Sequence, residues 1–265
     1  MQLSGLFIYP VKSLRGLSVR EAELTPRGLK HDRRFMVADP DGRFVTQREA
    51  PAMATVSTAL SGDALVLSRD GVECRVPLEP QGAAGRVVRC WTDMVRAMHV
   101  SDEADSFLSQ ALERDVQLVY MPQDSRRSVD PKHAEPDDVV SFADGFPYLL
   151  LGEASVEELN TRLDTPVDAG RFRPNLLVAG SEPYAEDSWG RVRIGDVEFV
   201  LPKGCTRCTV VNTDQHSGAR AKQPLATLAK YRPARKNAPI FGQNALARGS
   251  GTLRVGDRIA VLADR

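Results

Sequence analysis

The chain has 265 residues, with 35 Lys or Arg side chains against 35 Asp or Glu, so its formal net charge is zero. This balance argues against a general affinity for nucleic-acid polymers or anionic membranes, so any positively charged pocket has to be local. The length fits one large domain or two modest ones, and the 42% hydrophobic and 26% charged fractions are ordinary for a globular protein.

The sequence shows no signal for membrane insertion or secretion. No apolar run approaches the roughly 20 residues that a membrane-spanning helix needs. The opening residues, MQLSGLFIYPVKS, lack the basic lead and the cleavage site of a signal peptide. Four cysteines are too few for a disulfide scaffold, and Cys74 and Cys90 lie in strand-like runs typical of buried, reduced core residues. We therefore expect cytoplasmic residence, no membrane span and reduced thiols.

The first hundred residues are rich in short strand-like runs. Residues 3–9 form an apolar run that should end at Pro10, and residues 17–24 alternate with period two. Asp-Pro-Asp-Gly at 39–42 and Arg-Asp-Gly at 69–71 are turn signals, and each predicts a hairpin. The predicted arms are residues 34–38 with 43–46 and residues 64–68 with 72–78.

A helix and a long loop follow. Ser101 is a good N-cap for a helix whose apolar stripe runs through residues 104–112, and residues 116–120 return to a strand pattern. Residues 122–140 are polar and rich in Pro, Asp and Arg. We expect them to form a surface loop or linker that lines a site.

The second half mixes strands and helices. Ser155 and Glu158 fit a capping box that opens a helix through Leu163, and Pro224 suits the first turn of another helix. Residues 172–178 are expected to form a strand. Two similar stretches, 192–200 and 253–261, each predict a tight hairpin around a Gly-Asp turn. The pattern as a whole predicts a mainly β protein with a few helices (α+β).

The stretch Gly204 to Asp214, GCTRCTVVNTD, carries a Cys-x-x-Cys pair and a strand-like run at residues 209–211. A structural zinc site needs four ligands, and only His216 lies nearby. A dithiol redox pair needs a helix after its first cysteine. Two inert buried cysteines, or one thiolate on a larger metal cofactor with Arg207 neutralising its anionic groups, also fit. Spacing alone leaves all four readings open.

Eight segments in order make the sequence resemble a known family. They look like the MOSC-domain proteins that have an N-terminal MOSC β-barrel, including the mitochondrial amidoxime-reducing components and bacterial relatives that detoxify N-hydroxylated bases. The segments cover nearly the whole chain: YPVKSLRG (9–16), HDRRFMV (31–37), SFADGFPYLLLGEAS (141–155), FRPNLLV (172–178), EDSW (186–189), IGDVEF (194–199), GCTRCTVVNTD (204–214) and PIFGQN (239–244).

The resemblance implies an architecture and a cofactor. It predicts an N-terminal MOSC-associated β-barrel domain at residues 1–118 and a C-terminal MOSC β-barrel domain at 119–265, with the cofactor site between them. The implied cofactor is the molybdenum cofactor, Mo-molybdopterin. Its metal ligand and catalytic centre would be the second cysteine of the motif, Cys208, and Cys205 is expected to pack beside it.

The resemblance also implies a cofactor-binding set. Several cationic and hydroxyl donors from separate segments are what a phosphate and a dithiolene need. Gly145 and Phe146 stand where the vertebrate relatives have two hydroxyl residues, so any cofactor contact there is expected from the backbone, and Asn244 replaces a tyrosine. The residues carried over are Lys12, Ser13, Arg33, Arg173, Asn175, Thr206, Arg207 and Cys208.

The implied activity is a molybdenum-dependent oxidoreductase reaction that reduces the N–OH group of a small N-hydroxylated substrate to N–H with loss of water. The chain shows no cysteine-rich C-terminal segment, so a separate flavin, iron–sulfur or b-type cytochrome protein is expected to donate the electrons. Asp187 and the 122–140 loop are expected at the substrate entrance. The alternatives are a sulfur- or molybdenum-cofactor-carrier protein that uses Cys208 as persulfide or ligand, and a binding module without catalysis.

Overall fold

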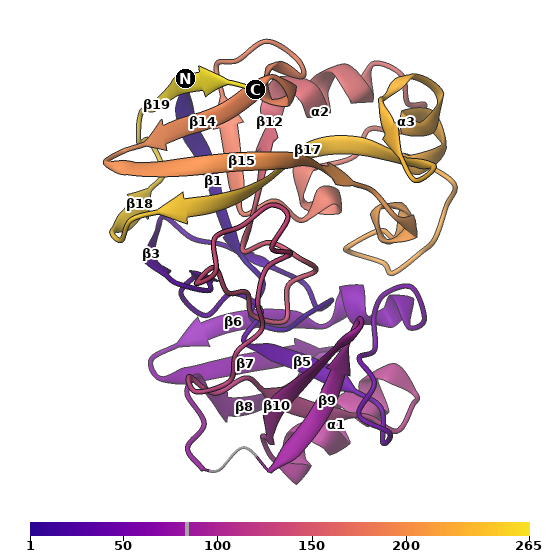
Figure 1. The fold of residues 1–265 in the computed structure, drawn as a ribbon. Helices are drawn as coiled ribbons and strands as arrows, with labels where there is room; N and C mark the ends of the chain where they lie inside the picture. Colours follow the sequence, from indigo (N-terminus) through magenta and orange to yellow (C-terminus); the bar gives the residue numbers. More distant parts are fainter. Residues whose placement is uncertain (83–84) are drawn as a thin grey trace.

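The computed structural model describes residues 1–82 and 85–265. Figure 1 shows two stacked parts, one drawn mainly in indigo to magenta and the other mainly in orange to yellow. In the described residues, β strands dominate and the α-helices are α1 (Asp102–Leu112), α2 (Glu153–Asn160) and α3 (Leu225–Tyr231). The expected mainly β fold with a few helices is therefore confirmed.

The N-terminal part packs two small sheets and α1 around one apolar core. One sheet has the strand order β5-β11-β10-β9 and the other β6-β7-β8. Leu65, Leu67, Leu108 and Leu118 are buried in this core, so both sheets and the helix contribute to it. The strands are β5 (Phe35–Ala38), β6 (Ser57–Ser61), β7 (Ala64–Arg69), β8 (Val72–Pro77), β9 (Arg86–Cys90), β10 (Asp93–His99) and β11 (Gln117–Tyr120).

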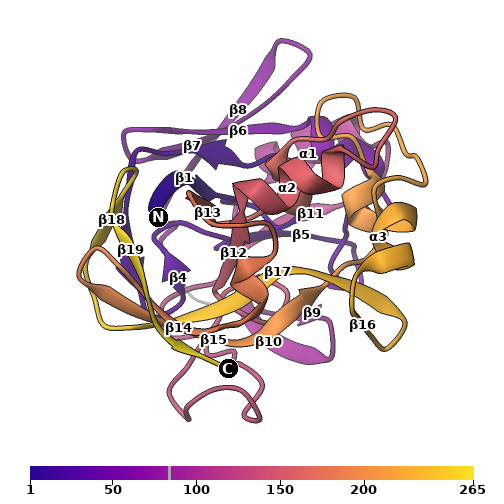
Figure 2. The same ribbon diagram turned by 90° about the horizontal axis from the view of Figure 1, so that it is seen from above.

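The other part is built on a large sheet with the order β19-β14-β15-β17-β12-β13-β1-β2. A second core lies on this sheet, and α2 and α3 lie at one end of it (Figure 2). Its strands, with the short β16 beside β17, are β1 (Gln2–Ile8), β2 (Leu17–Ser18), β12 (Tyr148–Gly152), β13 (Leu176–Ala179), β14 (Trp189–Ile194), β15 (Val197–Thr206), β16 (Ala234–Arg235), β17 (Ala238–Arg248) and β19 (Ile259–Asp264).

The start of the chain belongs to the large sheet. β1 pairs antiparallel with β13, and β3 (Glu21–Thr25) pairs with both β4 (Gly28–Leu29) and β18 (Thr252–Arg254). Chain order and spatial membership therefore differ. The chain leaves the large sheet after β2, adds β3 and β4 to a separate three-stranded sheet with β18, builds the N-terminal part and returns to the large sheet at β12. Segments near residues 12 and 33 consequently lie between the two parts.

Several sequence predictions are confirmed. β1 ends before Pro10, and β7 and β8 form the predicted hairpin around residues 69–71. The Ser101 hydroxyl accepts a hydrogen bond from the Ala104 amide at 3.2 Å, so it caps α1 as expected. Residues 192–200 form the β14–β15 hairpin, and Pro224 precedes α3.

Two N-terminal strand predictions are wrong in extent. The alternating run 17–24 is broken into β2 and β3, because β2 pairs with β1 whereas β3 pairs with β18. The turn at 39–42 forms, with the Arg43 amide bonded to Asp39 Oδ1 at 2.8 Å. The second arm is only partly formed: Phe44 bridges Ala38 and the Val45 amide donates to the Val37 carbonyl at 2.8 Å, whereas Arg43 bridges Arg89 of β9.

The predicted capping box at Ser155 is wrong. α2 begins two residues earlier, with Gly152 as its N-cap. The Ser155 hydroxyl is buried and donates to the Glu186 carboxylate at 2.8 Å, and it accepts from the Tyr184 amide. The Ser155 hydroxyl therefore binds Glu186, a residue distant in sequence, instead of capping the helix as the local sequence predicted.

Two later predictions are corrected. The stretch 253–261 is not a hairpin, because β18 pairs with β3 and β19 pairs with β14. The strand expected over 172–178 begins only at Leu176, since Phe172 ends a 3₁₀ turn and Arg173 is left-handed with φ 55°. This bend matters because it turns Arg173 away from the sheet.

Predictions about the core cysteines, the long loop and membrane spans can also be compared with the structure. Cys74 and Cys90 are buried and unpaired, which confirms the prediction of reduced core cysteines. Residues 122–140 form a long connection without a helix or strand, as expected. None of the helices in the described residues is long and apolar enough to cross a membrane.

Candidate functional site

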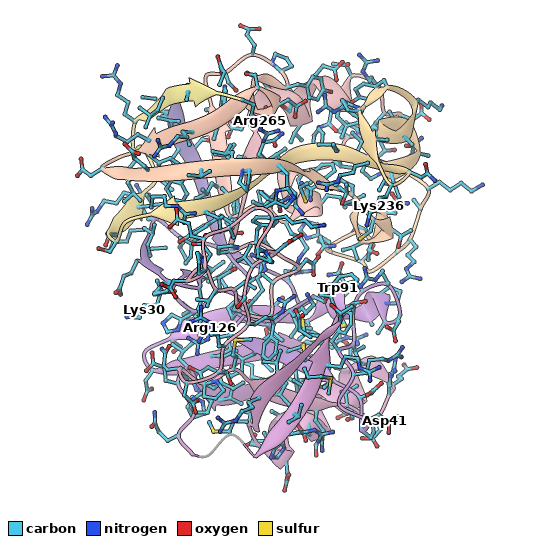
Figure 3. The ribbon with its side chains drawn as sticks, in the orientation of Figure 1. Lys30, Asp41, Trp91, Arg126, Lys236 and Arg265 are labelled. Carbon is cyan, nitrogen blue, oxygen red and sulfur yellow. The ribbon has the colours of Figure 1, made fainter. Side chains whose placement is uncertain are left out.

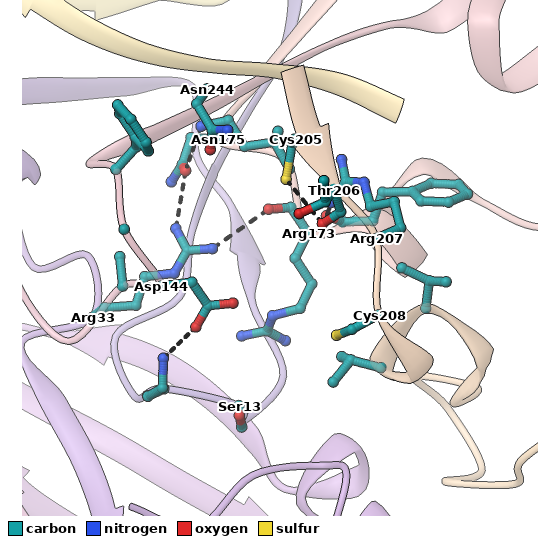
Figure 4. A pocket seen from close by; sticks show the side chains of 18 of the residues that line it. Ser13, Arg33, Asp144, Arg173, Asn175, Cys205, Thr206, Arg207, Cys208 and Asn244 are labelled. Carbon is teal, nitrogen blue, oxygen red and sulfur yellow. Dashed lines mark hydrogen bonds and ion pairs between the residues drawn. The ribbon is translucent and has the colours of Figure 1, made fainter. Parts of the chain in front are cut away.

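A pocket opens between the two parts of the molecule and holds about 870 Å³ of space, part of it open to solvent. Its walls come from segments far apart in the chain, including the turn after β1, the end of β15 and the turn before β13. Figure 4 shows several of these side chains facing one another. All of the sequence-predicted site residues line it: Lys12, Ser13, Arg33, Arg173, Asn175, Thr206, Arg207 and Cys208.

The two cysteines of the Cys-x-x-Cys pair differ in accessibility. Cys208 is exposed and lies two residues after the end of β15, whereas Cys205 lies half-buried in that strand. Burial raises the pKa of the Cys205 thiol, although Arg207 opposes the effect. The run 209–211 forms a 3₁₀ turn, so the strand expected there is wrong. Cys208 is therefore the accessible sulfur of the pocket.

The pair is not part of a zinc-type ligand cluster. Within residues 1–82 and 85–265, the group of three His, Cys, Asp or Glu side chains with converging ligand atoms is His99, Asp102 and Asp105, at the start of α1. His216 instead approaches Asp168 at 3.9 Å. The two thiols are free rather than bonded to each other.

Lys12 brings a buried ammonium group to one end of the pocket. Its Nζ donates to the Phe142 carbonyl at 2.8 Å and to Asp144 Oδ1 at 2.5 Å. Phe44 and Trp91 lie 5.6 and 5.8 Å from it, measured to their ring centres. Protein atoms around Asp144 act to raise the pKa of its carboxyl, but Lys12 outweighs them and holds that pKa well below its usual value.

Arg33 is held rigidly from three sides. Its Nη1 donates to Asp32 at 2.7 Å and to Asn175 Oδ1 at 2.9 Å, and its guanidinium stacks on Tyr9 at 4.3 Å. Burial lowers the pKa of Arg33, but the Asp32 carboxylate outweighs this and raises it. Asn175 therefore serves Arg33 through its side-chain oxygen, while its amide nitrogen donates to the Phe7 carbonyl.

Arg173 is the least neutralised of these cations. Its Nη1 donates to the Leu14 carbonyl at 2.7 Å, and its guanidinium lies 4.2 Å from the Tyr9 ring centre. Burial, together with repulsion from Arg33, lowers the pKa of Arg173 to about 10. Arg173 therefore stays charged at neutral pH, but burial makes its charge less favourable than in water, and a bound anion would stabilise it.

Three site residues adopt left-handed backbone conformations that are rare for side chains other than glycine. Ser13, Arg33 and Arg173 have φ values of 69°, 47° and 55°. Each costs about 1 kcal/mol or more, and such strain persists where the surrounding contacts enforce it. These three turns direct the Ser13, Arg33 and Arg173 side chains into the pocket wall.

Arg207 is fixed in the wall by backbone groups. Its Nε donates to the Phe241 carbonyl at 2.7 Å and its Nη1 to the Phe172 carbonyl at 3.1 Å. Its buried Nη2 has no hydrogen-bond partner among the described residues. Arg207 thus contributes a fixed positive charge and an unused donor beside the two cysteines.

These residues fit an anionic group that also binds a metal. The cations outnumber the carboxylates that line the pocket, and the accessible Cys208 sulfur lies in the same pocket. Phosphate oxygens and dithiolene sulfurs can accept hydrogen bonds from ammonium, guanidinium and hydroxyl donors. A cysteine thiolate is a ligand for soft transition metals. The donor set present is therefore consistent with the cofactor that the sequence predicted.

Sequence reasoning missed three charged wall residues and placed Asp187 and the 122–140 loop in the wrong position. Arg48, Asp144 and Arg171 line the pocket, although only Asp144 lies in a segment that the sequence analysis singled out. Asp187 is not a wall residue, because its carboxylate binds the side chains of Arg232 and Gln243.

The expectation that the 122–140 loop lines the entrance is also wrong for the described residues. The pocket wall draws instead on residues 143–146, just after the loop. Within the loop, Arg127 turns inward and donates to the Ser141 carbonyl at 2.9 Å. Asp138 likewise pairs with Arg248 at 2.7 Å. The loop therefore supports the wall segment without reaching the pocket.

Comparison with known proteins places this geometry in a family. Residues 1–115 match the model of the MOSC N-terminal beta barrel domain, and residues 137–260 match that of the MOSC domain. The chain is 36% identical over 281 residues to mitochondrial amidoxime-reducing component 1 of Mus musculus, covering 98% of this chain and 82% of that protein. For the Homo sapiens protein of the same name the identity is 34%, with the same coverage of 98% and 82%.

A second kind of relative also matches. The molybdenum cofactor sulfurase of Oryza sativa is 33% identical over 265 residues, which covers 91% of this chain but 32% of that longer protein. The name of the first kind of relative refers to amidoxime reduction, and that of the second to the molybdenum cofactor. Both match nearly the whole of this chain. The chain therefore belongs to the MOSC family, with an N-terminal MOSC β-barrel domain followed by a MOSC domain.

Proposed function

We propose that this protein is a molybdenum-cofactor-dependent reductase that converts N–OH groups of small molecules to N–H. The observation that carries the proposal is the joint placement of the accessible Cys208 sulfur and a set of buried cations in one pocket. The 36% identity to an amidoxime-reducing component over nearly the whole chain supports the reaction class. The two-domain division at 1–118 and 119–265, with the site between, remains part of this proposal.

Each residue has a role that follows from its contacts. Cys208 would hold the metal, and Lys12 with Ser13 would hold the phosphate in the same pocket. Arg33 and Arg173 would neutralise the remaining negative charge from fixed positions. When bound, the molybdenum cofactor would supply the two-electron redox chemistry, which protein side chains do not provide.

The distance between Lys12 and Asp144 sets a condition on binding. The Asp144 carboxylate already pairs with the Lys12 ammonium at 2.5 Å. A phosphate that binds Lys12 must therefore share the ammonium with that carboxylate or displace it. Asp144 faces the open pocket, so it is free to move aside, whereas the buried Lys12 is not. We therefore place the phosphate on the pocket side of Lys12.

We assign the electron supply to a separate donor protein. The names of the relatives describe an amidoxime-reducing component, which is in keeping with a multi-protein system. Cys208 lies at the open side of the pocket, where a docked donor would approach it. The identity of the donor, cytoplasmic residence and a role in detoxification stay predictions.

The test is cofactor content combined with reduction. Wild type, Cys208→Ser and Cys205→Ser are purified from a host that makes molybdopterin, and molybdenum and pterin are quantified. The proposal expects near-stoichiometric molybdenum in wild type and Cys205→Ser, loss in Cys208→Ser, and reduction of benzamidoxime by the loaded protein with reduced methyl viologen. Wild type without molybdenum, or full metal retention in Cys208→Ser, would overturn it.

A second candidate is a sulfur- or molybdenum-cofactor carrier. The match to the molybdenum cofactor sulfurase of Oryza sativa favours it, as does the accessible Cys208 thiol, which is suited to carry a persulfide. This candidate expects purified protein without reductase activity but with sulfur released by cyanide, lost in Cys208→Ser. The same purification therefore separates the two functions.

A further inference from the structure

Arg48 is a wall cation that comes from the N-terminal part of the molecule. Its Nη1 lies 4.0 Å from the Cys208 sulfur, although the two residues are 160 positions apart. Its guanidinium lies 4.4 Å from the ring centre of Trp91. The Arg48 carbonyl accepts a hydrogen bond from the Arg220 side chain, which ties this segment to the C-terminal part.

Trp91 is not among the residues that line the pocket, but it contacts two that do, Arg48 and Asp144. It lies in the turn between β9 and β10, has a left-handed backbone with φ 59°, and is 37% exposed. Its indole Nε1 donates to Asp144 Oδ1 at 3.3 Å, and its ring packs against Phe44 at 5.1 Å. Figure 3 shows Trp91 where the N-terminal part faces the C-terminal part.

The pair has the geometry of a binding wall. A guanidinium group is planar, stacks on aromatic rings and keeps its N–H donors free at its edge. Because Trp91 covers Arg48 from the side of the N-terminal part, the Arg48 donors point along the wall toward Cys208. Any group that Cys208 holds, or any small molecule beside its sulfur, lies within reach of Arg48 Nη1.

We propose that Arg48, held against the Trp91 ring, lines the substrate site and positions the N–O group of a substrate that carries a planar, conjugated substituent. This rests on the proposed reductase function. Arg48 donates a hydrogen bond to the substrate oxygen beside Cys208, and the flat guanidinium–indole stack supports the planar substituent. A substrate without such a substituent uses only the hydrogen bond.

The experiment compares two substrates on the loaded enzyme, with reduced methyl viologen as donor. Benzamidoxime has the planar group and hydroxylamine lacks it. Trp91→Leu is expected to raise the KM for benzamidoxime about tenfold with kcat little changed, because stacking of this kind is worth a factor of that order. The KM for hydroxylamine should stay as in wild type. Arg48→Lys should raise the KM for both, and more for benzamidoxime.

A matched control is Arg43→Lys, which lies in the same segment but pairs with Asp39 and Glu49. It should leave both KM values unchanged. Equal changes for the two substrates in Trp91→Leu, or no change in either, would overturn the proposal.

Binding is read out separately by fluorescence. The chain has two tryptophans, and Trp189 is buried, so a ligand in the pocket should quench Trp91 alone. Benzamidoxime is titrated into the oxidised, loaded enzyme without an electron donor. Quenching in wild type that disappears in Trp91→Phe supports the wall, and quenching that is equal in both overturns it. If wild type reduces neither substrate, the proposed function fails and this titration still decides the wall.

Discussion

The Asp144 carboxylate lies 2.5 Å from the Lys12 ammonium, across 132 positions of sequence. Lys12 is buried, whereas Asp144 faces the open pocket. The ammonium also keeps the Phe142 carbonyl at 2.8 Å, so it stays partly satisfied when the carboxylate moves. This arrangement lets a bound anion replace Asp144 without leaving a buried charge unpaired.

The pair should make stability depend on pH in the acid range. Because the pKa of Asp144 is lowered in the folded state, its stabilising contribution is present above the ordinary carboxyl pKa of about 4 and is lost as pH falls through the lower folded value. Asp144→Asn should therefore lose less stability than wild type on acidification below pH about 4. Urea unfolding at a series of pH values measures this. Asp137→Asn, an exposed carboxylate outside the pocket, is the control.

Breaking the buried Asp32–Arg33 pair should destabilise the protein strongly. Arg33→Met leaves the Asp32 carboxylate buried with the Tyr9 amide at 2.8 Å as a remaining partner, and we expect a loss of about 3 kcal/mol. The double variant Asp32→Asn with Arg33→Met should lose less than the sum of the single changes. A double-mutant cycle by chemical denaturation measures the coupling, and additive losses would contradict a coupled pair.

Ser155 should matter for Glu186 rather than for the start of α2. Ser155→Ala removes the hydroxyl that donates to the buried Glu186 carboxylate, so we expect a loss of about 1–3 kcal/mol. Glu186 keeps the Gly152 amide at 3.2 Å. In a thermal melt, Ser155→Ala should unfold at a lower temperature than Ser188→Ala, whose hydroxyl is exposed. Equal melting temperatures would show that the Glu186 contact contributes nothing.

Gly242 should tolerate no side chain, because two separate effects act there. It has φ 76°, and an added Cβ would lie 2.8 Å from the Leu150 carbonyl and 3.2 Å from Arg207 Nη2. Gly71 has a similar φ of 80° but nothing within 4 Å of such a Cβ. Gly71→Ala should therefore cost only the backbone strain of about 1–2 kcal/mol, and Gly242→Ala more.

The same pair of variants tests the cofactor site. Gly242→Ala should lower molybdenum content by displacing Arg207, while Gly71→Ala should leave it unchanged. Metal analysis of both proteins beside their unfolding free energies checks this. Equal stability and equal metal content in the two variants would contradict the steric argument.

The amino-acid sequence by itself determined the local elements and the chemistry of the central motif. Turn residues fix the hairpin at 69–71, and Ser101 fixes the start of α1, because these effects act within a few residues. The central motif places Thr206, Arg207 and Cys208 next to one another in the chain. They are therefore close in space whatever the tertiary structure. The eight predicted wall residues came from the family resemblance, which could be recognised because the motifs that carry it are short and continuous.

Only the tertiary structure decided which strands pair and which distant side chains complete the pocket. β18 and β19 look like one hairpin but join different partners, and Ser155 binds Glu186 instead of capping α2. Arg48 reaches Cys208 across 160 residues. Such contacts depend on how whole sheets pack, because burial of their faces outweighs local preference, and no short sequence pattern records that packing.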